Sequence, residues 1–172
     1  MAKDHFTDEF QKALQRETQK LFDTIWCIDG INTKCEYSKV DMLGKFNQYV
    51  DIGIKDDDNE HGFVGVEIEH FSNYEQAKEN IRKLKAWAHN STKRQCGLLH
   101  LCNEECYIYE NEICLLRDFA RDNEIKGYGF YYDYAFYTPG KMSPETVAKK
   151  VVASKDFRTR LYQLLKYIGS CQ

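Results

Sequence analysis

Two short stretches of alternating apolar and polar residues, separated by an acidic segment, constrain the fold more than any other feature. Residues 49–54 read Tyr-Val-Asp-Ile-Gly-Ile, and residues 63–69 read Phe-Val-Gly-Val-Glu-Ile-Glu. Because successive side chains of a β-strand point to opposite faces, each stretch places its valines and isoleucines on one face. The pattern predicts a β-hairpin with strands over 48–55 and 63–71 and a solvated turn over 56–62.

The two apolar faces also determine which acidic residues meet. A slip of one residue would turn one apolar set outward, so burying both sets together fixes the parity of the register. Asp51 then shares a face with Glu67 and Glu69, and pairing Asp51 with Glu67 centres the turn on Asn59. Such carboxylates repel one another unless a cation lies between them or they take up protons. Mg²⁺ or Mn²⁺ is the cofactor we expect, since Mg²⁺ binds carboxylate oxygens and leaves positions for phosphate oxygens.

Helices and further strands are predicted around this hairpin. Apolar periodicity predicts a helix over 6–25, one from Tyr74 to about Ala88, one from about Ile113 to Asn123, and two helical segments between Pro144 and Gly169. Residues 72–75, Ser-Asn-Tyr-Glu, fit a capping box at the start of the second helix. Further strands are expected over 31–37, 97–102, 107–109 and 128–137. This order predicts an α/β fold, a mixed β-sheet flanked by helices, in a single domain over 1–172.

Composition excludes several classes of protein. With 42% hydrophobic and 30% charged residues, the chain has the composition of a globular domain, and a formal charge of −3 gives no overall attraction for a polyanion. No apolar run reaches membrane-spanning length and the N-terminus does not resemble a signal peptide, so we expect a cytoplasmic protein with no membrane partner. The seven cysteines are expected as reduced thiols, because their number is odd and the N-terminus does not resemble a signal peptide. A zinc site at His100, Cys102 and Cys106 is disfavoured, because a second cysteine pair is lacking.

The acidic hairpin carries a family resemblance. Asp51, followed after 15 residues by Glu67-x-Glu69 and then by an amphipathic helix, resembles the PD-(D/E)XK nuclease superfamily. It is most similar to type II restriction endonucleases in which glutamate replaces the usual lysine, and the similarity covers roughly residues 6–102. The resemblance implies a restriction-endonuclease-like fold and a metal-dependent DNA endonuclease. It also implies that Asp51 and Glu67 bind Mg²⁺, while Glu69 orients or deprotonates the attacking water.

Other implications of the resemblance concern the first helix and the missing lysine. A helix acid often joins the metal site, which makes Glu17 a candidate ligand, with Glu36 a weaker one. Glu69 stands where lysine is usual, and no proline precedes Asp51. The alternative interpretation is therefore a catalytically inactive module on the same fold that binds DNA or protein.

Basic residues after the hairpin are candidates for contacting the phosphate backbone. They are Lys78, Arg82, Lys83, Lys93 and Arg94, with a second group at Lys149, Lys150, Lys155, Arg158 and Arg160. A solvated helix face explains each of them equally well. The chain leaves little room for a separate recognition domain, so double-strand cleavage would require a homodimer. An RNA-directed nuclease is a further alternative, which the sequence does not distinguish from a DNA endonuclease. The aromatic run over 128–137 and His100 fit packed strands better than a binding surface.

Overall fold

The fold is mixed α/β. The structure is a computed structural model that describes residues 5–22, 26–28, 31–33, 38–41, 51–56, 62–69, 73–90, 95–102, 108–132 and 142–167. The helices are α1 (His5–Phe22), α2 (Tyr74–Asn90), α3 (Glu110–Asp122), α4 (Pro144–Ala153) and α5 (Lys155–Tyr167). The strands are β1 (Trp26–Ile28), β2 (Ile31–Thr33), β3 (Ser38–Asp41), β4 (Ile52–Asp56), β5 (Gly62–Glu69), β6 (Gln95–Cys102) and β7 (Ile125–Tyr132).

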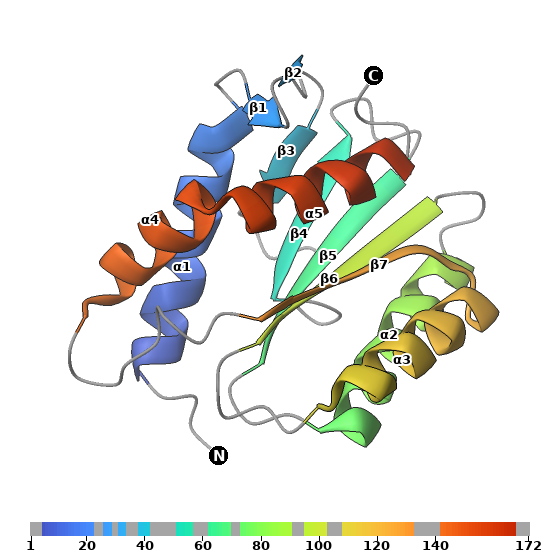
Figure 1. The fold of residues 1–172 in the computed structure, drawn as a ribbon. Helices are drawn as coiled ribbons and strands as arrows, with labels where there is room; N and C mark the ends of the chain where they lie inside the picture. The colour runs from blue at the N-terminus through green and yellow to red at the C-terminus, as the bar shows by residue number, and fades with distance from the viewer. Residues whose placement is uncertain are drawn as a thin grey trace.

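Five of these strands form one twisted sheet in the order β3-β4-β5-β6-β7 (Figure 1). The pairs β3–β4 and β4–β5 are antiparallel, whereas β5–β6 and β6–β7 are parallel. Parallel neighbours need a crossover connection, and the helices α2 and α3 lie in these two connections. The short strands β1 and β2 pair separately.

Helices cover both faces of the sheet (Figure 1). Val64 and Val66 of β5 belong to the core that the sheet shares with α1, α4 and α5, whereas Leu98 of β6 belongs to the core shared with α2 and α3. In β6, Leu99 is buried on the side opposite to Leu98, so this interior strand has buried apolar residues on both faces. The predicted α/β class is confirmed.

The starts of α2 and α4 agree with capping signals in the sequence, although the N-cap of α2 lies one residue after the predicted position. Helix α2 is capped by Asn73, whose Oδ1 accepts a hydrogen bond from the Gln76 backbone N–H at 3.0 Å. The predicted capping box was therefore placed one residue too early, because Asn73 is itself a strong N-cap residue. Helix α4 begins as predicted, with Ser143 as the N-cap and Pro144 in the first turn.

Strand predictions differ from the structure at residues 108–109, at β1, which was not predicted, and at β3. Residues 108 and 109 form no strand; Tyr109 instead caps α3, and its backbone N–H donates to the Glu112 carboxylate at 2.8 Å. Strand β3 was not predicted, because Ser38–Asp41 carries only one aliphatic residue and forms a strand through pairing with β4. Of the turn predicted over 56–62, Asp56 ends β4 and Gly62 begins β5, and residues 57–61 lie outside the described residues, as do 133–137 and 168–169.

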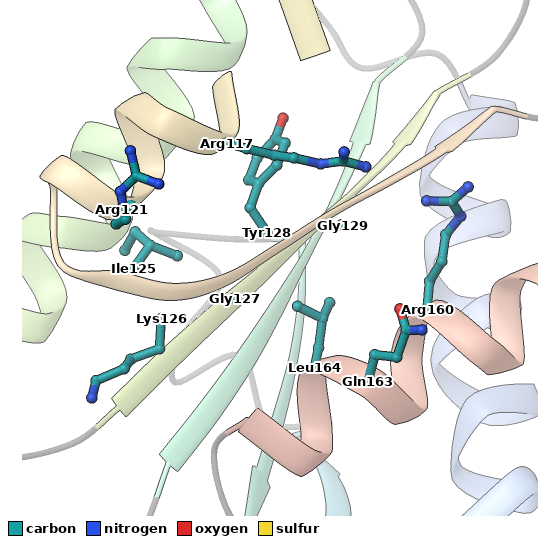
Figure 2. Close-up of a pocket in the computed structure, with 10 residues that line it drawn as sticks. All are labelled: Arg117, Arg121, Ile125, Lys126, Gly127, Tyr128, Gly129, Arg160, Gln163 and Leu164. Carbon is teal, nitrogen blue, oxygen red and sulfur yellow. The ribbon is translucent and has the colours of Figure 1, made fainter. Parts of the chain in front are cut away.

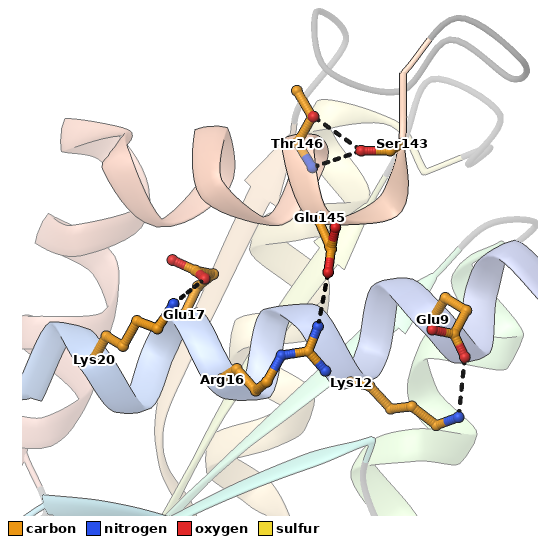
Figure 3. Close-up of polar contacts among 8 residues, drawn as sticks. All are labelled: Glu9, Lys12, Arg16, Glu17, Lys20, Ser143, Glu145 and Thr146. Carbon is orange, nitrogen blue, oxygen red and sulfur yellow. Dashed lines mark hydrogen bonds and ion pairs between the residues drawn. The ribbon is translucent and has the colours of Figure 1, made fainter.

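On the far side of the sheet from α2 and α3, α1 packs beside α4. An exposed ion pair joins them, with Arg16 Nη2 3.4 Å from Glu145 Oε1 (Figure 3). A pair so exposed adds little stability, and the buried apolar residues of both helices hold the contact. In the part of the chain that the structure describes, no helix combines the length and apolarity needed to span a membrane.

The turn between α3 and β7 stores backbone strain that a mutation can remove. Glu124 has φ of 65°, a left-handed conformation that favours glycine. We expect Glu124→Gly to raise the free energy of unfolding by about 0.5–1 kcal/mol in urea denaturation, since glycine suits the position after a helix end. The control is Asp122→Gly, which removes the same charge inside α3 and should lower the free energy of unfolding slightly. A loss of stability in Glu124→Gly would contradict this account.

Candidate active site

Asp51 lies immediately before β4, at the end of the β4–β5 ladder. The register pairs Ile52 with Val66 and Ile54 with Val64, so its continuation by one residue sets Asp51 opposite Glu67. This is the register parity that the sequence predicts. The apolar partners are fully buried in the core beneath α1, α4 and α5. Asp51 and Glu67 therefore belong to the other face of the hairpin.

Hydrogen bonds from α1 and β5 hold Asp51. Its Oδ2 accepts the backbone N–H of Ile68 at 2.8 Å. Its carbonyl oxygen accepts the side-chain amides of Gln11, at 2.6 Å, and Gln15, at 3.4 Å. The two glutamines are four residues apart and so lie on one face of α1. Helix α1 thus fixes the backbone of Asp51, and β5 orients its carboxylate.

Glu67 occupies a buried position on the central strand β5. Its exposed fraction is only 8%. In the parallel register Glu67 aligns with His100 of β6, and aligned residues of neighbouring strands share a face. A carboxylate at this depth requires compensation by hydrogen bonds, a positive group or a metal ion, because desolvation disfavours its charge.

His100 is completely buried beside this acid. Its Nδ1 shares a hydrogen bond of 2.5 Å with the Tyr128 hydroxyl of β7, and the two rings meet edge to face. Burial lowers the pKa of His100 to about 3, so the imidazole is neutral near pH 7. The prediction of a packed-strand histidine is confirmed.

The third predicted acid, Glu69, ends strand β5. Its backbone pairs with Cys102, but its side chain lies outside the described residues. Among the described side chains, no group of three His, Cys, Asp or Glu is arranged to hold a metal ion. The oxygen donors of Asp51 and Glu67 match the preference of Mg²⁺ in kind, and whether Glu69 completes the set stays a prediction.

Glu17 does not join these acids in the structure. Its carboxylate pairs with Lys20 at 2.7 Å (Figure 3), and its side chain is 18% exposed. Glu17 is two residues beyond Gln15, which turns it about 200° around α1 from the face that contacts Asp51. Glu36, the weaker candidate, lies outside the described residues.

The predicted phosphate-contacting residues of α2 are engaged within the protein. Lys78 pairs with Glu75 at 2.8 Å and lies 4.7 Å from the centre of the Tyr74 ring. Arg82 pairs with Glu79, and Lys83 donates to Asn80 Oδ1, each at 3.1 Å. Arg82 and Lys83 are exposed, whereas Lys78 is mostly buried and supports the contact between α2 and α3. Lys93 and Arg94 lie outside the described residues.

The fold gathers a group of cations at β7, of which sequence reasoning named only Arg160 as a candidate for contacting phosphate. A pocket of about 340 Å³ at this strand is lined by Arg117 and Arg121 of α3, Lys126 of β7, and Arg160 of α5 (Figure 2). The spacing of Arg117 and Arg121, four residues apart on a predicted helix, was a usable signal for half of this group. Arg160 joins them only through the tertiary fold.

The cysteines whose side chains the structure describes are free thiols: Cys96 and Cys102 are buried, and Cys114 is exposed. Burial, with a smaller contribution from Glu124, raises the pKa of the Cys96 thiol to about 12, so Cys96 is protonated and unreactive near neutral pH. Cys106, the other cysteine of the zinc alternative, lies outside the described residues.

Burial of neutral His100 predicts a pH dependence of stability. The unfolded chain takes up a proton at this histidine below about pH 6.5, whereas the folded protein resists protonation until about pH 3. Stability is therefore lost as the pH falls through this window. When the pH is lowered from about 7 to about 5, the free energy of unfolding measured in urea should fall by about 2 kcal/mol more in the wild type than in His100→Gln. Equal losses in the two proteins would contradict this account, because they would mean that the pKa of His100 is the same in the folded and unfolded states.

Similarity to other proteins does not assign this site. Comparisons with protein-family models, curated proteins and solved structures found no significant match to this chain. Function is therefore inferred from the residues and their geometry.

Proposed function

We propose that this protein is a metal-dependent DNA endonuclease with a restriction-endonuclease-like fold, and that Asp51 and Glu67 bind its Mg²⁺ or Mn²⁺. The observation that carries the proposal is the hairpin register, in which Ile52 pairs with Val66; its continuation by one residue supports a position of Asp51 opposite Glu67, on the face away from α1. The order of elements supports it as well. A helix, the hairpin, a second helix and a parallel strand follow one another, as the resemblance implies.

The bonding of Asp51 supports a catalytic role over an ordinary surface turn. Catalytic carboxylates work when their supporting contacts hold them in one orientation. The side chains of Gln11 and Gln15 hold the carbonyl oxygen of Asp51, and the Ile68 N–H holds its carboxylate, so both ends of the residue are fixed. A solvated turn does not need long-range anchoring from a helix about 40 residues away.

Each residue has a defined part in the proposed reaction. A bound Mg²⁺ would stabilise negative charge on the phosphodiester and lower the pKa of the attacking water. Asp51 and Glu67 would supply its carboxylate oxygens, and Glu69 would orient or deprotonate the water. His100, neutral and bonded to Tyr128, supports the strand beside Glu67 without adding a charge.

Cleavage of supercoiled plasmid with Mg²⁺ or Mn²⁺ tests the proposal. The wild type should cut, and Asp51→Asn and Glu67→Gln should each lower the rate by about 100-fold or more, because each removes a charged metal ligand. The matched control is Asp122→Asn, which removes an exposed acid of α3 and should cut like the wild type. Circular dichroism would verify that every variant is folded.

Two outcomes would overturn the proposal. Wild-type rates in Asp51→Asn would exclude this acid from the reaction. No cutting by any preparation that still binds DNA would favour the catalytically inactive module on the same fold. Replacing the plasmid with RNA in the same assay distinguishes the two classes of nucleic acid.

A homodimer is the form we propose for double-strand cleavage, because one site of this kind cuts one strand. Gel filtration with a DNA duplex should therefore elute two protein chains per duplex. The expected plasmid product is linear rather than nicked. A monomer on DNA that yields only nicked circles would contradict the dimer and leave the assigned acids untouched.

A further inference from the structure

The outer strand of the sheet carries a second polar site, away from the acidic hairpin. Within the described residues β7 pairs with β6 on one side only, and the pocket of about 340 Å³ opens along it. Figure 2 shows β7 passing between arginines from α3 and Arg160 with Gln163 from α5. A ligand in this pocket would therefore meet side chains from both faces of the sheet.

The charges in this pocket are available to a ligand. Arg117 and Lys126 are exposed, and no carboxylate partner is recorded for either among the described residues. Arg121 pairs with Asp118 at 2.8 Å and Arg160 with Asp156 at 3.2 Å. Arg121 and Asp118 are mostly exposed, and such surface pairs contribute so little that an incoming phosphate can replace the carboxylate.

The concentration of positive charge here is a local departure from the whole chain. The formal net charge of the protein is −3, yet four cationic side chains line this one pocket. A charged residue on an outer strand also prevents unwanted strand pairing, and Lys126 alone would serve that purpose. The arginines come from the flanking helices α3 and α5, so protection of the strand does not explain why they converge.

We propose that this pocket is a binding site for the sugar-phosphate backbone of nucleic acid. The choice of nucleic acid as the ligand rests on the proposed function; the binding itself does not require cleavage. Arginine forks match phosphate oxygens, and cations on several elements can contact successive phosphates of a polymer. Repulsion between like charges disfavours a second copy of this chain at the same strand.

The position of the pocket suits a substrate that also reaches the acids. Tyr128 lines the pocket and pairs through Leu98 with Gly65, which is two residues before Glu67 on β5. Two strand spacings across the sheet and two residues along it amount to about 12 Å between the backbones of Tyr128 and Glu67. A nucleic acid spans this distance within a few nucleotides.

Fluorescence anisotropy with a labelled duplex of about 20 base pairs, in EDTA, tests the site without cleavage. All proteins carry Asp51→Asn, and Arg117→Gln/Lys126→Gln is compared with the control Lys12→Gln/Lys166→Gln, which removes two exposed cations that do not line the pocket. The pocket variant should bind about tenfold or more weakly. Its slope of log affinity against log salt should fall by about 2, since two phosphate contacts are lost. The control should bind like its parent.

Several results would overturn the site. They are equal weakening of both double variants, unchanged binding by the pocket variant, and no duplex binding by the parent. Binding of inorganic phosphate or ATP at this pocket, in a protein that does not bind the duplex, would also overturn it, in favour of a small phosphorylated ligand. If the pocket variant binds weakly while Asp51→Asn does not affect cutting, the pocket stands and the proposed active site fails. If the pocket variant binds as its parent does and cleavage depends on Asp51, the proposed active site stands and the pocket fails.

Discussion

The structure depends on the burial of two aliphatic pairs across the β4–β5 hairpin. Ile52 faces Val66 and Ile54 faces Val64, all at 1% exposure or less. Each buried side chain of this size contributes about 1.5–3 kcal/mol, so a slip that turned one strand outward would cost several kcal/mol. The same slip would take Asp51 away from Glu67 and from the Ile68 N–H. Core packing thus determines where the acids lie.

Helix α1 connects that core to the candidate site. Phe10 and Leu14 are buried against the sheet, and the neighbouring positions Gln11 and Gln15 reach the carbonyl oxygen of Asp51. Apolar and polar contacts of one helix therefore act together. The helix packs through its apolar residues, and the glutamines then position the acid at the entrance to β4.

Charge is distributed unevenly across the sheet. The acids of β4 and β5 lie toward one side, and the cations around β7 lie at the outer strand on the other. Between them, His100 in β6 is buried and neutral, and its hydrogen bond to Tyr128 joins the two parallel strands. This separation keeps the cations from neutralising the acids directly, as the proposed metal site and the proposed phosphate-binding pocket would require.

The sequence by itself determined the elements with strong periodicity and the pairing of the acids. The α/β class, the helices α1 to α5, and the register that sets Asp51 against Glu67 all follow from local patterns, because alternation and helical spacing are properties of short segments. Only the tertiary structure decided that Glu17 turns away from Asp51. It alone also decided that Gln11 and Gln15 hold the backbone of Asp51. It also decided that Arg160 meets Arg117 at β7, since contacts between distant segments depend on how helices pack and leave no periodic trace in the chain.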